Sequence, residues 1–317
     1  MAGRGVRRWM ASSSMPPSPL PRFLEEQARD VAVSFTDMVE SLDSSVDRSA
    51  ASAFRERIRH GQHTGPTPGH APGFVQANFV ALPRSEAEDF LQFALRNPRG
   101  CPLLAVTEPG NPCPTHVAPD ADLRTDIPKY WVRCQGQDVE EHTDITSLWT
   151  DDMVGFLLGC SFSWEGHLER AGHPPRQVTE GKNVPMFRTN IRNRPFGKFQ
   201  GDFVVSMRPY PPEDIARVAA ITATYPAAHG APVHWGNPEA LGIRTEQLDS
   251  PDWGDAVTMH PGEVPVFWAC GVTSQTAVLE AAPPLAITHA PGHMFVTDVV
   301  DSQVQVSVSE DEDPGAG

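Results

Sequence analysis

The sequence has few cysteines, and their spacing does not suggest pairs. There are five in 317 residues, an odd number with no C-x-x-C spacing. They are Cys101, Cys113, Cys134, Cys160 and Cys270. A disulfide framework and a structural zinc site both need more regular cysteine patterns. The sequence therefore predicts neither, and a reducing compartment, the cytoplasm, is expected.

Positive charge and long apolar runs are also scarce. Lys and Arg number 25 against 40 Asp and Glu, a net charge of −15. This balance argues against nucleic acid or an anionic membrane as the main partner. The longest apolar run, residues 153–160, is far too short to span a bilayer. If the substrate is an anion, its pocket must supply its own arginines or backbone amides, because the overall field opposes it.

Familiar cofactor and metal motifs are missing. The sequence contains no Walker loop, no strand-linked G-x-G-x-x-G and no H-E-x-x-H. His289 and His293 are four residues apart, but Pro291 and Gly292 prevent the helix that would make this spacing useful for zinc. We therefore expect neither a metal nor a cofactor.

Proline and aromatic residues, by contrast, are plentiful. Thirty-two prolines predict short elements joined by rigid turns, and 39% hydrophobic residues with 15 Phe and 7 Trp are typical of a globular protein. Strands are predicted at 74–82, 102–106, 129–133 (as an edge strand), 202–207, 233–235, 256–259, 264–268, 285–288 and 294–300. Helices are predicted at 23–38, 53–60, 85–96, 145–159, 164–171, 212–224 and 272–279, and a basic loop at 183–201. Alternating strands and helices indicate an α/β fold with mixed sheets and flanking helices.

The stretch 261–278 is the most informative. A Pro-Gly turn leads into a short apolar strand, and Cys270-Gly271 then leads into a helix with Thr273 or Ser274 as its expected N-cap. Free amides and the positive end of the helix dipole converge at such a junction. We expect it to form the floor of a pocket for a small carboxylate.

The two ends of the chain are predicted to lie outside the main domain. Residues 1–24 carry four arginines and no acid, a composition similar to a mitochondrial presequence. The alternatives are a disordered extension or a start at Met10 or Met15, so the mitochondrial matrix stays open as a second location. We predict an N-terminal extension over 1–52, one domain over 53–301 and an acidic tail over 302–317.

Several long motifs occur in a fixed order within that domain. They are residues 64–78, 159–165, 183–190, 205–209, 232–238, 251–255, 262–273 and 287–292. Together they resemble the D-glutamate cyclase family, also catalogued as hydro-lyases. The resemblance implies two interlocked α/β subdomains, the smaller expected within about 120–210. It also implies water loss from D-glutamate to give 5-oxo-D-proline, as in the vertebrate members. Those members are mitochondrial and carry a further carboxy-terminal domain, so the shorter, bacterial-type form is expected here.

Cyclisation of glutamate requires proton transfer and stabilisation of a carboxyl group, and the candidate residues follow from that need. The candidates for catalysis are Glu165, His234, Glu263 and Cys270. The candidates for substrate binding are Ser161, Ser163, Arg188, Asn190, Arg192, Arg208, Asp255, Thr273 and His289. Each has a structural alternative: helix capping for the hydroxyls and Glu165, ion pairs or a solvated face for the arginines, and core positions for the histidines and Cys270. Glu263 could serve a turn, and Asp255 could orient a histidine or form an Asx-turn.

Three hypotheses follow for function. The first is D-glutamate cyclisation without a cofactor, the second a hydro-lyase acting on another small carboxylic acid, and the third a non-catalytic protein that binds small carboxylates. A homo-oligomer stays open.

Overall fold

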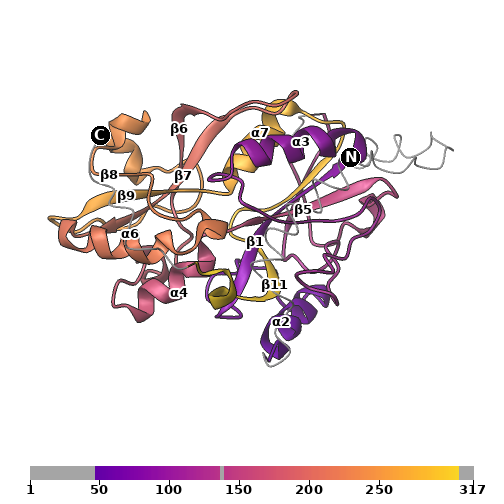
Figure 1. Cartoon of the computed structure of the whole chain (residues 1–317), viewed down its shortest axis with the longest axis horizontal. Coiled ribbons are helices and arrows are strands. Elements are labelled where there is room, and N and C mark those ends of the chain that lie inside the picture. Colours follow the sequence, from indigo (N-terminus) through magenta and orange to yellow (C-terminus); the bar gives the residue numbers. More distant parts are fainter. Residues whose placement is uncertain (1–46, 136–138, 307–317) are drawn as a thin grey trace.

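The computed structural model describes residues 47–135 and 139–306 (Figure 1). The presequence-like segment 1–24, the helix predicted at 23–38 and the end of the acidic tail lie outside these residues. The helices are α2 (Ser49–Arg59), α3 (Arg84–Arg96), α4 (Phe162–Arg170), α5 (Arg176–Thr179), α6 (Ile215–Ala223) and α7 (Val272–Ala281). The strands are β1 (Phe74–Pro83), β2 (Leu103–Val106), β3 (Tyr130–Arg133), β4 (Glu140–His142), β5 (Met153–Gly159), β6 (Met186–Arg192), β7 (Asp202–Tyr210), β8 (His234–Trp235), β9 (Val264–Ala269), β10 (Ala286–His289) and β11 (Phe295–Val300).

The strands form two sheets. The larger has the order β2-β5-β1-β10-β3-β4, with β11 also paired to β1, and the smaller has the order β6-β7-β9-β8. The predicted α/β class is confirmed. Within the described residues the strand pairs in both sheets are antiparallel rather than mixed in direction. The smaller sheet uses residues 186–269, and the subdomain boundaries given above stay a prediction.

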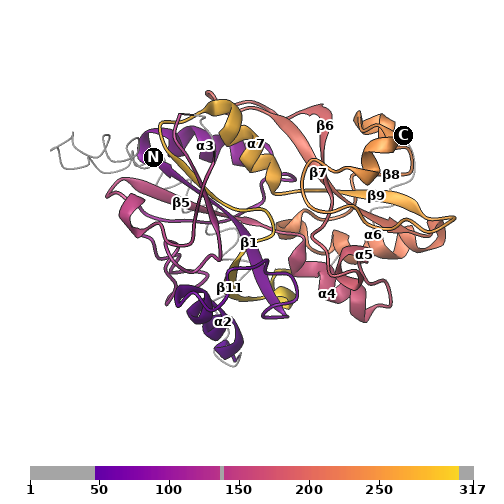
Figure 2. The same cartoon turned by 180° about the vertical axis from the view of Figure 1, so that it is seen from behind.

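Helices on both sides tie the two sheets together. Figure 1 shows α3 and α7 on one side and α4 and α6 on the other, and the reverse view in Figure 2 agrees. Helix α4 follows β5 of the larger sheet and contacts β1 and α6, whereas α7 follows β9 of the smaller sheet and contacts β7 and β1. A hydrophobic cluster that includes Trp164 and Trp268 spans the boundary. The two strand–helix junctions are therefore held in one continuous core.

Four predicted elements differ from the structure. The strand predicted at 256–259 has no regular secondary structure. The helix predicted at 145–159 is instead a 3₁₀ turn followed by strand β5, whose seven residues are all buried. A short, wholly apolar run does not distinguish a buried strand from a helix, and here β1 and β2 pair with both sides of it. Strand β3 is an interior strand between β10 and β4, not an edge strand. The predicted basic loop at 183–201 contains β6, which pairs with β7.

No helix in the described ranges is long and apolar enough to cross a membrane.

Candidate active site

The turns that follow β5 and β9 meet in one cavity, which we call the junction cavity. Its polar lining residues are Asn78, Cys160, Ser161, Asn183, His229, Cys270 and His289. The pairing of strands brings these residues together. Asn78 of β1 pairs with Leu158 of β5, which lies two residues before Cys160. His289, at the end of β10, lies beside Phe79 of β1. The volume is about 20 Å³, room for a single water. A larger ligand therefore requires the walls to move.

Two helices begin at this cavity. Both α4 and α7 lack a side-chain cap at their N-terminus. Helix α4 begins two residues after Cys160 and α7 begins two residues after Cys270, and both cysteines line the cavity. The positive ends of two helix dipoles thus face one small space, an arrangement that favours a carboxylate or a developing oxyanion. The predicted N-cap is wrong, since Gly271 takes that position and the Ser274 hydroxyl donates to the Gly271 carbonyl, 2.7 Å away.

The two thiols are held in their protonated form. Burial raises the pKa of Cys270 to about 11, and it raises the pKa of Cys160 well above the usual thiol range. Arg208 and the helix amides act in the opposite direction but are outweighed by desolvation. A position just before a helix start can lower the pKa of a thiol, but at Cys270 burial outweighs this effect. These thiols are suited to donating protons rather than to acting as resting thiolates.

His289 is a neutral imidazole, because burial lowers its pKa to about 4. Its Nδ1 lies 3.0 Å from the Phe79 amide nitrogen and 3.2 Å from the Phe79 carbonyl oxygen. His229, which also lines the cavity, is likewise kept neutral by burial, with a pKa of about 4, and its Nδ1 donates to the Arg99 carbonyl at 2.7 Å. His289 can thus act as a neutral hydrogen-bond donor.

A buried ion pair lies directly behind the cavity. The Arg208 guanidinium is fully buried and donates through Nη2 to Glu165 Oε1 at 2.5 Å and to the Ser161 hydroxyl at 3.1 Å. It also lies over the rings of Trp164 and Trp268. Burial raises the pKa of Glu165, although Arg208 and Gln177 oppose the shift. Arg208 is therefore an ion-pair partner that holds Ser161 at the cavity wall.

Three further predicted residues support the cavity or its surroundings. The Thr273 hydroxyl accepts from the Val204 amide at 3.0 Å and thereby fixes α7 to β7. The Asp255 carboxylate accepts from the Asn183 amide at 2.9 Å, so the residue that it orients is an asparagine and not a histidine. The Ser163 hydroxyl accepts from the Gln76 amide at 3.2 Å and lies on the far side of the first turn of α4.

The remaining predicted residues lie outside the junction cavity. Three of them lie on β6. Arg192 forms ion pairs with Asp202 and Glu280, and Arg188 lies 3.5 Å from Asp202 and over the ring of Trp253. Asn190 packs against Gly242. His234 Nε2 lies 2.7 Å from the Asn237 carbonyl. Glu263 pairs with Arg176 and accepts from the His260 amide. Each of these side chains except the exposed Asn190 has a polar partner within the protein.

Sequence reasoning did not select Asn78, Asn183 or His229 for the site. Asn78 and Asn183 stand at the ends of two of the motifs, 64–78 and 183–190, and that position was the available signal. No group of three or more His, Cys, Asp or Glu residues within the described ranges could hold a metal ion.

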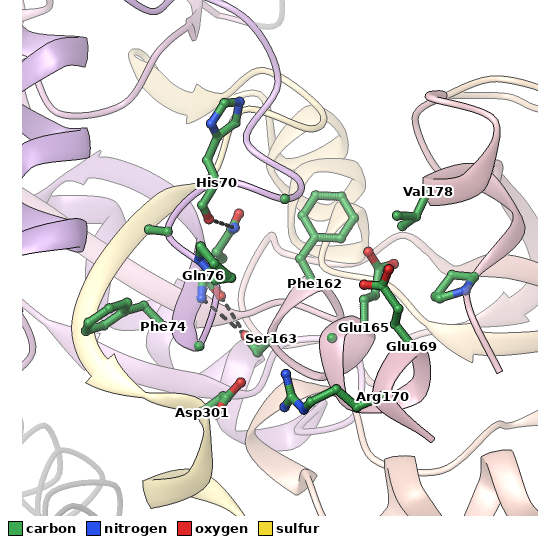
Figure 3. A pocket seen from close by; sticks show the side chains of 16 residues that line it. His70, Phe74, Gln76, Phe162, Ser163, Glu165, Glu169, Arg170, Val178 and Asp301 are labelled. Carbon is green, nitrogen blue, oxygen red and sulfur yellow. Dashed lines mark hydrogen bonds between the residues drawn. The ribbon is translucent and has the colours of Figure 1, made fainter. Parts of the chain in front are cut away.

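A second and larger pocket lies on the other side of the first turn of α4 (Figure 3). We call it the α4 pocket, and its volume is about 170 Å³. Glu165 and Ser163 line it, and Phe162 lines both it and the junction cavity. The side chain of Phe162 is thus part of the wall between the two spaces.

Comparisons with known proteins identify the family of this chain. A sequence model of the D-glutamate cyclase family matches residues 154–298, which include both strand–helix junctions. Three bacterial relatives are each named "Putative hydro-lyase". The relative from Rubrobacter xylanophilus is 57% identical over 256 residues, 81% of this chain and 98% of its own length. The relative from Pseudomonas syringae pv. syringae is 54% identical over 261 residues, 82% of this chain and 97% of its own. The relative from Stutzerimonas stutzeri is 52% identical over 254 residues, 80% and 95% respectively. The chain belongs to the D-glutamate cyclase family.

Proposed function

We propose that this protein is a water-eliminating carbon–oxygen lyase whose substrate is a small amino or carboxylic acid, and that it converts D-glutamate to 5-oxo-D-proline. One observation carries the proposal: two helix N-termini and two protonated thiols converge on the junction cavity. The family match and the names of the relatives support the reaction class.

The balance of the reaction fits such a site. A carbon–nitrogen bond forms between the amine and the γ-carboxyl carbon, and one carboxyl oxygen leaves as water. The ammonium group gives up two protons and the departing oxygen takes up two, so no net proton, electron or phosphate is consumed. The chemistry therefore asks for charge stabilisation and a proton shuttle, and it does not call for a cofactor.

We assign the roles as follows. One proton passes from the ammonium to the γ-carboxylate, and the free amine then attacks the carboxyl carbon. The oxyanion that forms is stabilised by the helix amides and by the ring N–H of the neutral His289. The Cys270 thiol donates to the departing hydroxyl, and its thiolate, beside the N-terminus of α7, takes the remaining proton from nitrogen. The Arg208–Glu165 pair positions Ser161.

A second candidate is dehydration of another small carboxylic acid, favoured by the printed names of the relatives. The same amides and thiols would serve, because a hydroxyl group also leaves as water when a thiol protonates it. For location we propose a reducing compartment such as the cytoplasm, since all five cysteines are free.

The test is an assay for loss of one water by mass, with D-glutamate, L-glutamate and a panel of hydroxy acids. The purified wild type should convert D-glutamate, and Cys270→Ser should lower kcat by roughly 10²–10⁴-fold, the usual range for a lost proton donor. Cys134→Ser is the matched control, because Cys134 lies outside the junction cavity, and it should leave kcat unchanged.

Three outcomes count against parts of this proposal. Turnover of a hydroxy acid but of neither glutamate enantiomer would favour the second candidate. A raised Tm with several carboxylates and turnover of none would indicate a non-catalytic binding protein. Full activity in Cys270→Ser would remove Cys270 from the mechanism.

A further inference from the structure

The α4 pocket has the size and the polar lining of a ligand site. Its volume of about 170 Å³ is on the order of ten times the space that one water needs. Its walls come from the loop Gly69–Gly73 on one side and from α4 on the other (Figure 3). Three carboxylates line it, those of Glu165, Glu169 and Asp301.

Two of these carboxylates are already paired within the protein. Glu165 is held by Arg208 at 2.5 Å, and Asp301 lies 2.9 Å from Nε2 of His167. Glu169 has no hydrogen-bond or ion-pair partner among residues 47–135 and 139–306. Its negative charge is therefore available to a ligand in the pocket.

A positive charge without a carboxylate partner lines the same pocket. Arg170 makes no ion pair within 4 Å in the described part of the chain. Its guanidinium folds back over α4, so that a Cβ added at Gly166 would lie 3.3 Å from Nη1. In Figure 3 Arg170 reaches toward Ser163 and Asp301, whereas the carboxylates of Glu165 and Glu169 lie together on the other side.

We infer that the α4 pocket binds the zwitterionic head of a small amino acid, with its carboxylate on Arg170 and its ammonium group on Glu169. Two opposite charges, neither paired with another of the described residues, match the two charges of such a ligand, and a guanidinium can hold a carboxylate in two-pronged geometry. A dicarboxylate without an amine would satisfy only Arg170.

This site is separate from the junction cavity, and the inference stands whether or not that cavity dehydrates D-glutamate. Phe162 forms part of the wall between the two spaces. An amino acid seated in the α4 pocket would therefore lie next to the start of α4, on the opposite side from the thiols.

The experiment is calorimetric titration of the full chain with D-glutamate and with glutarate, which has the same two carboxylates but no amine. Arg170→Gln should weaken binding of both ligands at least tenfold. Glu169→Gln should weaken D-glutamate tenfold and leave glutarate unchanged or tighter, because only the ammonium group needs that carboxylate. Both residues are exposed, so both variants are expected to fold, and circular dichroism checks this.

Arg217→Gln, an exposed charge on α6 outside the pocket, is the matched control and should change neither titration. The inference is overturned if D-glutamate binds both pocket variants as tightly as wild type, or if Glu169→Gln weakens both ligands equally. It is also overturned if wild type binds neither D-glutamate nor any of glycine, D-alanine and D-aspartate. If the wild type binds D-glutamate but eliminates no water from it, the proposed function fails and this inference stands.

Discussion

Removal of one charge from the buried Arg208–Glu165 pair should destabilise this protein strongly, and loss of Glu165 should cost more than loss of Arg208. Arg208 has no exposed side-chain surface, and Glu165 is its only carboxylate partner among the described residues. In Glu165→Gln the guanidinium keeps its charge, because arginine does not deprotonate in proteins. A buried charge left without its partner costs about 3–5 kcal/mol.

The opposite variant should cost less. In Arg208→Met the orphaned Glu165 can take up a proton, and burial already raises its pKa. We therefore expect a loss of about 2–3 kcal/mol, close to that of an unsatisfied buried polar group. The double variant Glu165→Gln/Arg208→Met should lose less than the sum of the two single variants, by roughly 0.5–3 kcal/mol, because the two residues interact directly.

Urea unfolding followed by circular dichroism measures all three free energies of unfolding. Glu280→Gln is the control, since it breaks the exposed pair with Arg192 and should cost no more than about 1 kcal/mol. The reasoning fails if Glu165→Gln is as mild as this control, or if the effects of the two single changes simply add.

Three further changes test other parts of the structure. Gly159→Ala should destabilise the fold by several kcal/mol or prevent folding, because a Cβ at this position would overlap the backbone carbonyl of Ala227. Gly65→Ala is the control and should be tolerated, since the nearest atom to its added Cβ is 3.7 Å away. Soluble yield and Tm compare the two variants. Thr273→Val should lower the free energy of unfolding by about 1–3 kcal/mol, because the buried Val204 amide loses its acceptor. The same urea unfolding measures this change, and an unchanged unfolding midpoint would contradict the contact. Acid should destabilise the fold between pH 6.5 and about 4, because the unfolded chain protonates His229 and His289 in this range while the folded protein does not. Each histidine contributes about 3 kcal/mol of stability that is present above pH 6.5 and lost as the pH falls. The substitution His289→Gln should therefore flatten the Tm–pH profile in that window.

The local sequence predicts most helices and strands, but not those whose form is decided by pairing with neighbouring strands. Helix α3 agrees with its predicted bounds to within one residue, because its buried positions Ala87, Phe90, Leu91 and Ala94 repeat with the helical period. Strands β1 and β5 are both buried along almost their whole length and show no period of two. The strand predicted over β1 is confirmed and the helix predicted over β5 is wrong, because pairing with β1 and β2 decides the form of β5. Strand β6 looked like a basic loop because its last three residues are exposed.

The candidate site divides in the same way. The sequence alone determined the strand–glycine–helix junction near residue 270 and the glycine turn that leads into a helix near residue 160, because turn and helix-start preferences are local. Only the tertiary structure decided that both junctions open on one cavity, that Asn78 and His229 line it too, and that Arg208 is neutralised by Glu165. Burial by residues distant in sequence also set the charge states of Cys270 and His289, because desolvation depends on what packs around a group and not on its neighbours along the chain.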